Sequence, residues 1–241
     1  MHTVRISALV IGGVALLGAL GGPAQAKAQQ AATGAPVWGS IDRYLMADRD
    51  AEIALARSAA PSSIADRAEI LVLGPHGFQT AVAGTNGFVC LVGRSWAAAA
   101  DADYGNPTVR VPMCVNAPAA RSYLPRVTRI TDLAIAGYSV NQVSAAMGVA
   151  VARHELPPME DGAMCYMMSK LGYGGPANPH WPSHLMFFYS NVDPASWGAN
   201  QQGSPIIAVA DSLEQLTQFV IPVDHWSDGT PAAQMPQAAR P

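Results

Sequence analysis

The chain has 241 residues, of which 14 are lysine or arginine and 17 are aspartate or glutamate, so its formal net charge is −3. Proteins whose main partner is a nucleic acid or an anionic membrane surface need a clustered basic face, and this balance argues against both classes. The length suffices to bury one sizeable hydrophobic core.

The N-terminus has the pattern of a secretory signal peptide. Arg5 precedes an uncharged, mostly apolar run over residues 6–20, and the sequence AQA at residues 24–26 fits a signal-peptidase site. The run is shorter than the roughly 20 apolar residues that a membrane span needs, so a retained anchor is the weaker alternative. We therefore expect residues 1–26 to be removed, giving a secreted or periplasmic protein without membrane attachment.

Local patterns then predict the elements in turn. Residues 27–39 are small and polar and predict a flexible leader, and residues 40–59 have the apolar spacing of an amphipathic helix, whole or broken. Residues 69–96 contain three strand-like runs, EILVLG, FQTAVAG and GFVCLVGRSW, whose turn signals predict an antiparallel meander. In the following segment, VRVPMCVN, Pro112 fits only an edge strand or a bulge.

Helices are predicted for the middle of the chain. Asn116 can cap a helix, and two further helices follow, of which the first ends at Gly137 and the second begins with the capping box of Ser139 and Gln142. This pair resembles the helix-turn-helix of DNA-binding proteins. It carries no basic residue between Ser139 and Arg153 that could reach phosphates, so we interpret it as packing.

Four strand-like runs occupy the last third, over residues 163–173, 184–190, 205–210 and 216–223, before a polar tail that we expect to be disordered over residues 227–241. Strands, then helices, then strands predict a single α+β domain over residues 40–226. We expect a mainly antiparallel sheet of about six to seven strands, with three to four helices packed on it. The run from His184 is apolar on both faces, which predicts a covered strand with Phe187 in the core.

Five motifs occur in the order GTNGFVC (84–90), PMC (112–114), YMMSKLGYGG (166–175), HLMFF (184–188) and IPVDHWSDGT (221–230). Over about residues 51–230, the chain thereby resembles a group of exported bacterial proteins that have no assigned activity. The resemblance implies a disulfide between Cys90 and Cys114, with Cys165 as a free thiol, and it implies no reaction. The sequence allows the same pairing, because the segments around Cys90 and Cys114 can be neighbouring strands, and such a bridge could be worth about 3 kcal/mol.

The stretch NPHWPSHLMFFYS places His180 and His184 four residues apart. A zinc or copper site usually needs three or four converging ligands, and in an extended segment these two histidines would lie about 13 Å apart. A third ligand would have to come from elsewhere, and the candidates are His76, Glu155, Asp224 and His225. We therefore expect no cofactor, with zinc or copper at His180 and His184 as the alternative.

Nucleophilic chemistry has few candidates. A hydrolase could pair Cys165 or Ser169 with His184, but a hairpin would hold Cys165 about 15 Å from that histidine, with Ser169 closer. A cysteine in the middle of a strand is more often buried than reactive. Nearby methionines could bind copper, although methionine on adjacent strands more often belongs to the core. These methionines are Met164, Met167, Met168 and Met186.

The sequence therefore predicts a domain that binds a small ligand or a protein partner without catalytic chemistry. Trp181 and His184, at the mouth of a covered strand, are the predicted binding residues. The alternative is a metal-binding protein or hydrolase centred on His180 and His184.

Overall fold

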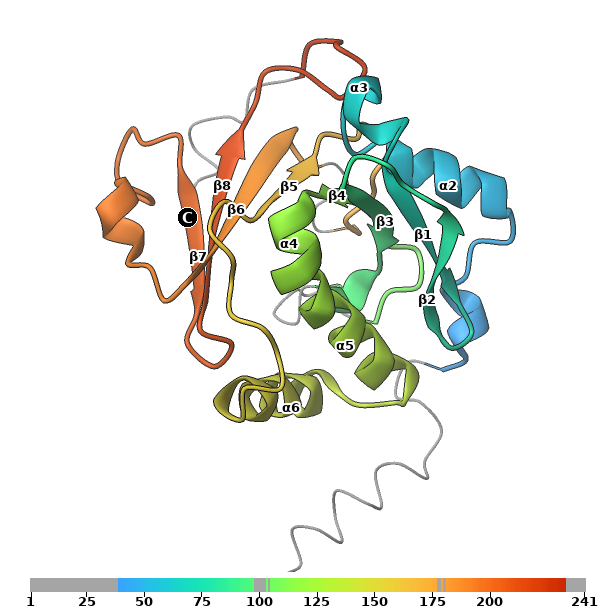
Figure 1. The fold of residues 1–241 in the computed structure, drawn as a ribbon, viewed down its shortest axis with the longest axis horizontal. Coiled ribbons are helices and arrows are strands. Elements are labelled where there is room, and N and C mark those ends of the chain that lie inside the picture. The colour runs from blue at the N-terminus through green and yellow to red at the C-terminus, as the bar shows by residue number, and fades with distance from the viewer. Residues whose placement is uncertain (1–38, 98–102, 104, 177–178, 180, 233–241) are drawn as a thin grey trace, which may run out of the picture.

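The computed structural model describes residues 39–97, 103, 105–176, 179 and 181–232. The predicted signal peptide, nearly all of the leader, His180 and the last part of the predicted tail lie outside these residues. The described part forms an α+β structure around one sheet of eight strands in the order β2-β1-β3-β4-β5-β6-β8-β7 (Figure 1). The α+β prediction is confirmed. The described residues form eight strands rather than six to seven, and five α-helices rather than three to four.

The elements have the following bounds. The strands are β1 (Glu69–Gly74), β2 (Gly77–Val82), β3 (Val89–Gly93), β4 (Val111–Val115), β5 (Met164–Met167), β6 (His184–Ser190), β7 (Ile207–Asp211) and β8 (Leu216–Pro222). The α-helices are α2 (Arg49–Arg57), α3 (Ser62–Ala65), α4 (Ala117–Ser122), α5 (Leu124–Ile135) and α6 (Val140–Ala152). Short 3-10 helices are η1 (Ile41–Arg43), η2 (Ser95–Ala97) and η3 (Pro194–Trp197).

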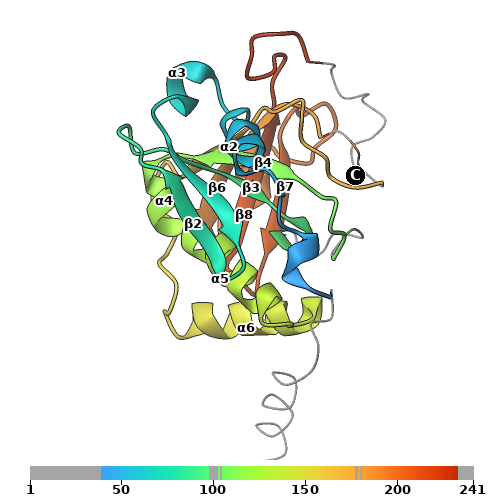
Figure 2. The same ribbon diagram turned by 90° about the vertical axis from the view of Figure 1, so that its right-hand side faces the viewer.

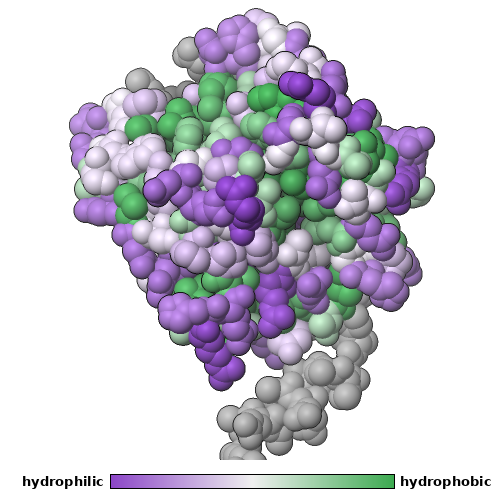
Figure 3. Space-filling view, in the orientation of Figure 1, coloured by the Kyte–Doolittle hydropathy of each residue, from purple (hydrophilic) through white to green (hydrophobic). Residues whose placement is uncertain are grey.

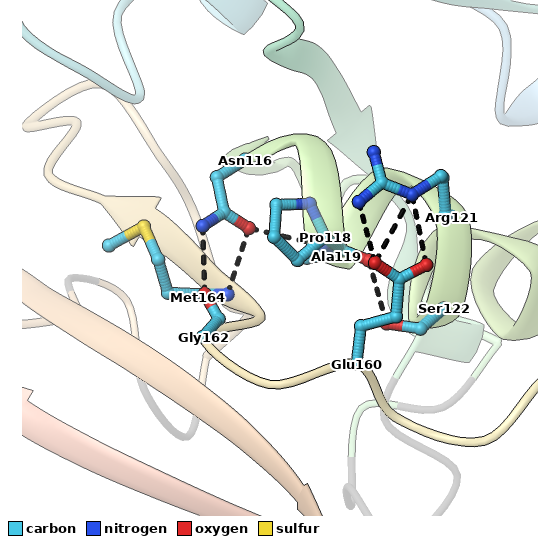
Figure 4. Close-up of polar contacts among 8 residues, drawn as sticks. All are labelled: Asn116, Pro118, Ala119, Arg121, Ser122, Glu160, Gly162 and Met164. Carbon is cyan, nitrogen blue, oxygen red and sulfur yellow. Dashed lines mark hydrogen bonds and ion pairs between the residues drawn. The ribbon is translucent and has the colours of Figure 1, made fainter.

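Helix starts follow the local signals in the sequence. The Asn116 side chain accepts a hydrogen bond from Ala119 N at 3.1 Å and thereby caps α4. The same side chain also bonds the backbone of Gly162 and Met164, so the cap ties α4 to the start of β5 (Figure 4). Ser139 and Gln142 form the predicted capping box of α6.

The predicted meander is wrong in one pairing. β1 and β2 form the expected antiparallel hairpin, but β3 lies on the other side of β1 and runs parallel to it. The loop after β2 must therefore cross the start of β1. Gly84 makes this crossing possible, because a Cβ atom there would lie 2.2 Å from Glu69 N.

Pro112 lies in an interior strand, contrary to the prediction of an edge or a bulge. β4 has β3 on one side and β5 on the other. β5 pairs with β4 only at Cys114 and Val115, and at the level of Pro112 the neighbour on that side is Gly172, whose added Cβ would meet the proline ring at 3.1 Å. Because the ladder with β5 has already ended, the ring displaces none of its hydrogen bonds.

Helices cover both faces of the sheet (Figure 2). Cys90 and Cys114 face α2, where they pack with apolar residues such as Ile70. Alternate residues such as Leu91 and Met113 face α4 and α5 in the largest apolar cluster. α6 lies across one end of the sheet, below it in both views. None of the helices in the described ranges is long and apolar enough to cross a bilayer.

The two cysteines implied by the resemblance lie directly opposite each other on β3 and β4. Their sulfur atoms are 2.04 Å apart in a disulfide, and both residues are fully buried. Cys165, on β5, is buried and carries a free thiol.

The start of the predicted tail is packed on the domain. Ser227 donates a hydrogen bond from its backbone to Met168 O at 2.9 Å and another from its hydroxyl to Ser58 O at 2.6 Å. Asp228 forms an ion pair with Lys170. The described part of the tail, residues 227–232, is therefore held against the loop after β5.

Candidate binding cavity at the start of β6

A notch opens in the sheet where β5 ends. β5 stops at Met167, whereas β4 continues back to Val111, and the two sides meet again only at an isolated bridge between Arg110 and Tyr173. A cavity lies at this notch, and its walls include Arg110, Tyr173, Trp181 and His184. The structure thus brings the two predicted binding residues to one cavity.

His184 is almost fully buried, with 1% of its surface exposed. Its Nδ1 atom lies 2.6 Å from the carbonyl oxygen of Pro182. A carbonyl can only accept, so Nδ1 carries the proton and Nε2 of the neutral ring is an acceptor. Burial lowers the pKa of His184, and the bond to Pro182 opposes this shift only partly, so the ring is neutral at physiological pH.

Trp181 stacks against this histidine, with ring centroids 6.0 Å apart and ring planes 24° from parallel. Its Nε1 atom and His184 Nε2 are both buried, and neither has a hydrogen-bond partner among the described residues. A buried polar group without a partner costs roughly 1–3 kcal/mol, so two such atoms beside one cavity indicate a site that something else completes.

A second, more apolar cavity adjoins the first. Both cavities are lined by Val111, Met167 and Trp181. The second one also touches Met113 and Met186, and its polar lining residues include Arg94, Ser95 and Gln218. The two cavities together offer a polar end at His184 and a mostly apolar end.

Positive charge lies beside the polar end. Arg110 is half-buried, and its Nη1 donates to the carbonyls of Pro107 and Val109 at 2.8 and 2.7 Å. No carboxylate in the described part of the chain forms an ion pair with it. Burial and the nearby Arg94 lower the pKa of Arg110 to about 10, so it stays protonated at neutral pH. Arg94 itself is neutralised by an ion pair with Glu52 at 2.8 Å.

The contacts of Ser169 do not favour a hydrolase. Its hydroxyl lies 2.6 Å from the Ser58 hydroxyl, which in turn donates to Leu55 O. Each serine has one hydroxyl proton, so Ser169 donates to Ser58 and has no proton left for His184.

The position of Cys165 also argues against nucleophilic catalysis. It lies opposite Met186 in the pairing of β5 with β6. His184 lies opposite Met167, two register pairs away from Cys165. Burial raises the pKa of the Cys165 thiol to about 12, and catalytic cysteines need the opposite shift.

We predict that Cys165 resists alkylation in the native protein. With a pKa near 12, its thiolate fraction at pH 8 is about a thousandfold below that of an ordinary cysteine, and burial blocks access as well. Mass spectrometry after iodoacetamide treatment should find no label on the native chain, one label after denaturation, and three after denaturation with reduction. Labelling of the native chain at the rate of a free thiol would contradict the prediction.

The candidate metal ligands do not converge. His76, Glu155, Asp224 and His225 are all exposed, and none lines the cavity in which His184 is buried. No group of three or more histidine, cysteine, aspartate or glutamate residues is arranged around a common point within the described ranges. His180 lies outside those ranges. The positive charge of Arg110 also disfavours a cation at this cavity.

Several cavity residues did not follow from sequence reasoning. Arg110 directly precedes β4, Met113 lies on it, and Tyr123 lies where α4 meets α5. No spacing in the sequence connects these positions with His184, because strand order alone brings them together. The one local signal was Pro112, an unusual residue for an interior strand.

Comparison with family models, with curated proteins and with solved structures gives no match for this chain. The likeness to exported proteins inferred from the motifs therefore stays a prediction, and the function is argued from the site alone.

Proposed function

We propose that this protein is a small-ligand-binding protein without catalytic chemistry, and that its site is the pair of cavities at the start of β6. One observation carries the proposal: Trp181 Nε1 and His184 Nε2 are buried beside the same cavity without partners in the described part of the chain. Small-molecule sites are mostly apolar, with a few polar groups in fixed positions. A buried site of this kind suits a small molecule better than a protein partner, which would contact exposed side chains.

The cellular location belongs to the same proposal. A signal-peptide pattern over residues 1–26 and a disulfide between Cys90 and Cys114 both support export to the periplasm or the cell exterior. The intact mass of the exported protein tests this part, and it should correspond to a chain that begins at Lys27.

A fragment screen by nuclear magnetic resonance tests the binding proposal. The probes are indole, cyclohexanol, benzamide, benzoate and benzylamine, and the readout is the indole N–H signal of Trp181, assigned with a Trp181→Phe variant. At least one fragment should shift this signal. Trp197 is the internal reference, because it stacks on Phe219 in a separate cluster, at 4.2 Å between ring centroids. If no fragment moves the Trp181 signal, the cavity is not a binding site.

The same spectra test the metal alternative. Zinc and copper(I) are added to the protein in turn, and neither should change the Trp181 signal at one equivalent. A stoichiometric shift that is lost in a His180→Ala variant would favour the metal site over the proposed one.

A further inference from the structure

The two unpartnered nitrogen atoms define what a ligand must offer. An indole Nε1–H can only donate a hydrogen bond. His184 Nε2 can only accept one, because Nδ1 holds the ring proton against Pro182 O at 2.6 Å. A single group that satisfies both atoms must therefore accept a hydrogen bond from Trp181 and donate one to His184.

We infer that the ligand is an uncharged molecule with an apolar body, whose polar end both accepts and donates a hydrogen bond, as a hydroxyl or a primary carboxamide does. This inference rests on the proposed function and adds the chemical class of the ligand. The polar end lies between Trp181 and His184, and the body extends along the wall that both cavities share.

The apolar body follows from the second cavity. Three methionines, Met113, Met167 and Met186, line it together with Trp181. Methionine side chains are flexible and polarisable, so such a wall adapts to aliphatic and aromatic bodies alike.

Charge argues against ionised ligands. A cation would meet the guanidinium of Arg110, which has no carboxylate partner in the described part of the chain, in a partly desolvated site. A carboxylate would be attracted to Arg110 but can only accept hydrogen bonds, so its oxygen would face the lone pair of His184 Nε2.

Matched probes test the class directly. We would titrate the protein with 3-phenylpropan-1-ol, its methyl ether, 3-phenylpropanamide and 3-phenylpropanoate, and repeat the series with octan-1-ol and its counterparts. The alcohol and the amide should bind. The methyl ether lacks the donor, and the carboxylate lacks it at neutral pH, so each should bind at least about tenfold more weakly. A carboxylate that binds as tightly as the alcohol, or an ether that equals the alcohol, would overturn the inference.

Variants of Trp181 and His184 test which protein atom forms a hydrogen bond with which part of the probe. Trp181→Phe keeps a ring but removes the donor, and it should weaken the alcohol and the ether by the same factor, so their ratio stays. His184→Leu removes the acceptor, and the ratio should fall to about one. Trp197→Phe is the matched control and should change neither affinity.

The experiments distinguish a failure of the ligand class from a failure of the binding proposal. His184 is buried, so its variant could fail to fold; the alcohol-to-ether ratio in the native protein and in Trp181→Phe then decides. If no probe binds while fragments shift the Trp181 signal, the ligand class is wrong and the binding proposal stands. If fragments leave that signal unchanged, both are wrong.

Discussion

A Glu52→Ala variant should lose about 3–5 kcal/mol of unfolding free energy, the usual result of breaking a buried ion pair from one side. The Glu52 and Arg94 side chains are 3% and 0% exposed, and Glu52 Oε1 also accepts a hydrogen bond from Leu73 N. Without the carboxylate, the Arg94 guanidinium keeps its charge with no water to solvate it, beside the equally charged Arg110. Urea unfolding followed by circular dichroism measures the loss.

An exposed ion pair provides the control. Arg121 and Glu160 form a bidentate pair on the surface, with 61% and 39% of their side chains exposed (Figure 4). Hydrophilic and hydrophobic residues are interspersed over the face of the molecule that Figure 3 shows. Glu160→Ala should have a far smaller effect than Glu52→Ala, because water solvates the remaining arginine. Comparable losses for the two variants would show that burial does not set the cost.

A double variant isolates the buried charge. Arg94→Met should cost less in the Glu52→Ala background than in the native protein, because there it removes a buried charge that has no partner. Strictly additive losses would mean that Glu52 and Arg94 act independently.

Local signals predicted the parts of this fold that depend on local physics. The Asn116 cap and the capping box of Ser139 and Gln142 lie within a few residues of the helices that they start, and both are present. The hairpin of β1 and β2 is equally local. The parallel pairing of β3 with β1 is not local, because it depends on which edge of the β1–β2 hairpin β3 joins after the loop that contains Gly84.

The residues of the candidate cavity also divide into those that the sequence predicts and those that it does not. Trp181 and His184 could be picked out because a Pro-rich loop that enters a covered strand is visible in the sequence. Arg110 and Met113 could not, since they reach the cavity through the position of β4 in the sheet. The lone pair of His184 Nε2 is a property of the folded state alone, created by the bond between Nδ1 and Pro182.

The strand β6 gives the clearest case of information that the sequence lacks. Its alternating residues pack on opposite faces, and the sequence pattern favoured Phe187 as the core residue. The structure places Phe188 in the largest cluster, fully buried and stacked on Tyr123 with ring centroids 3.7 Å apart. Phe187 is half-buried against Trp197 in a smaller cluster. Both faces are apolar, so periodicity cannot tell which one meets the larger core.

Phe188→Ala should therefore lose about 3–5 kcal/mol of unfolding free energy, because it leaves a ring-sized cavity in tightly packed surroundings. Phe187→Ala should lose clearly less, about half as much, because its half-buried site can relax toward water. Phe188→Leu is the control for volume and should cost less than the alanine variant. Urea unfolding of the three variants gives the order directly, and a loss for Phe187→Ala that equals or exceeds that for Phe188→Ala would mean that the larger core lies on the opposite face of β6.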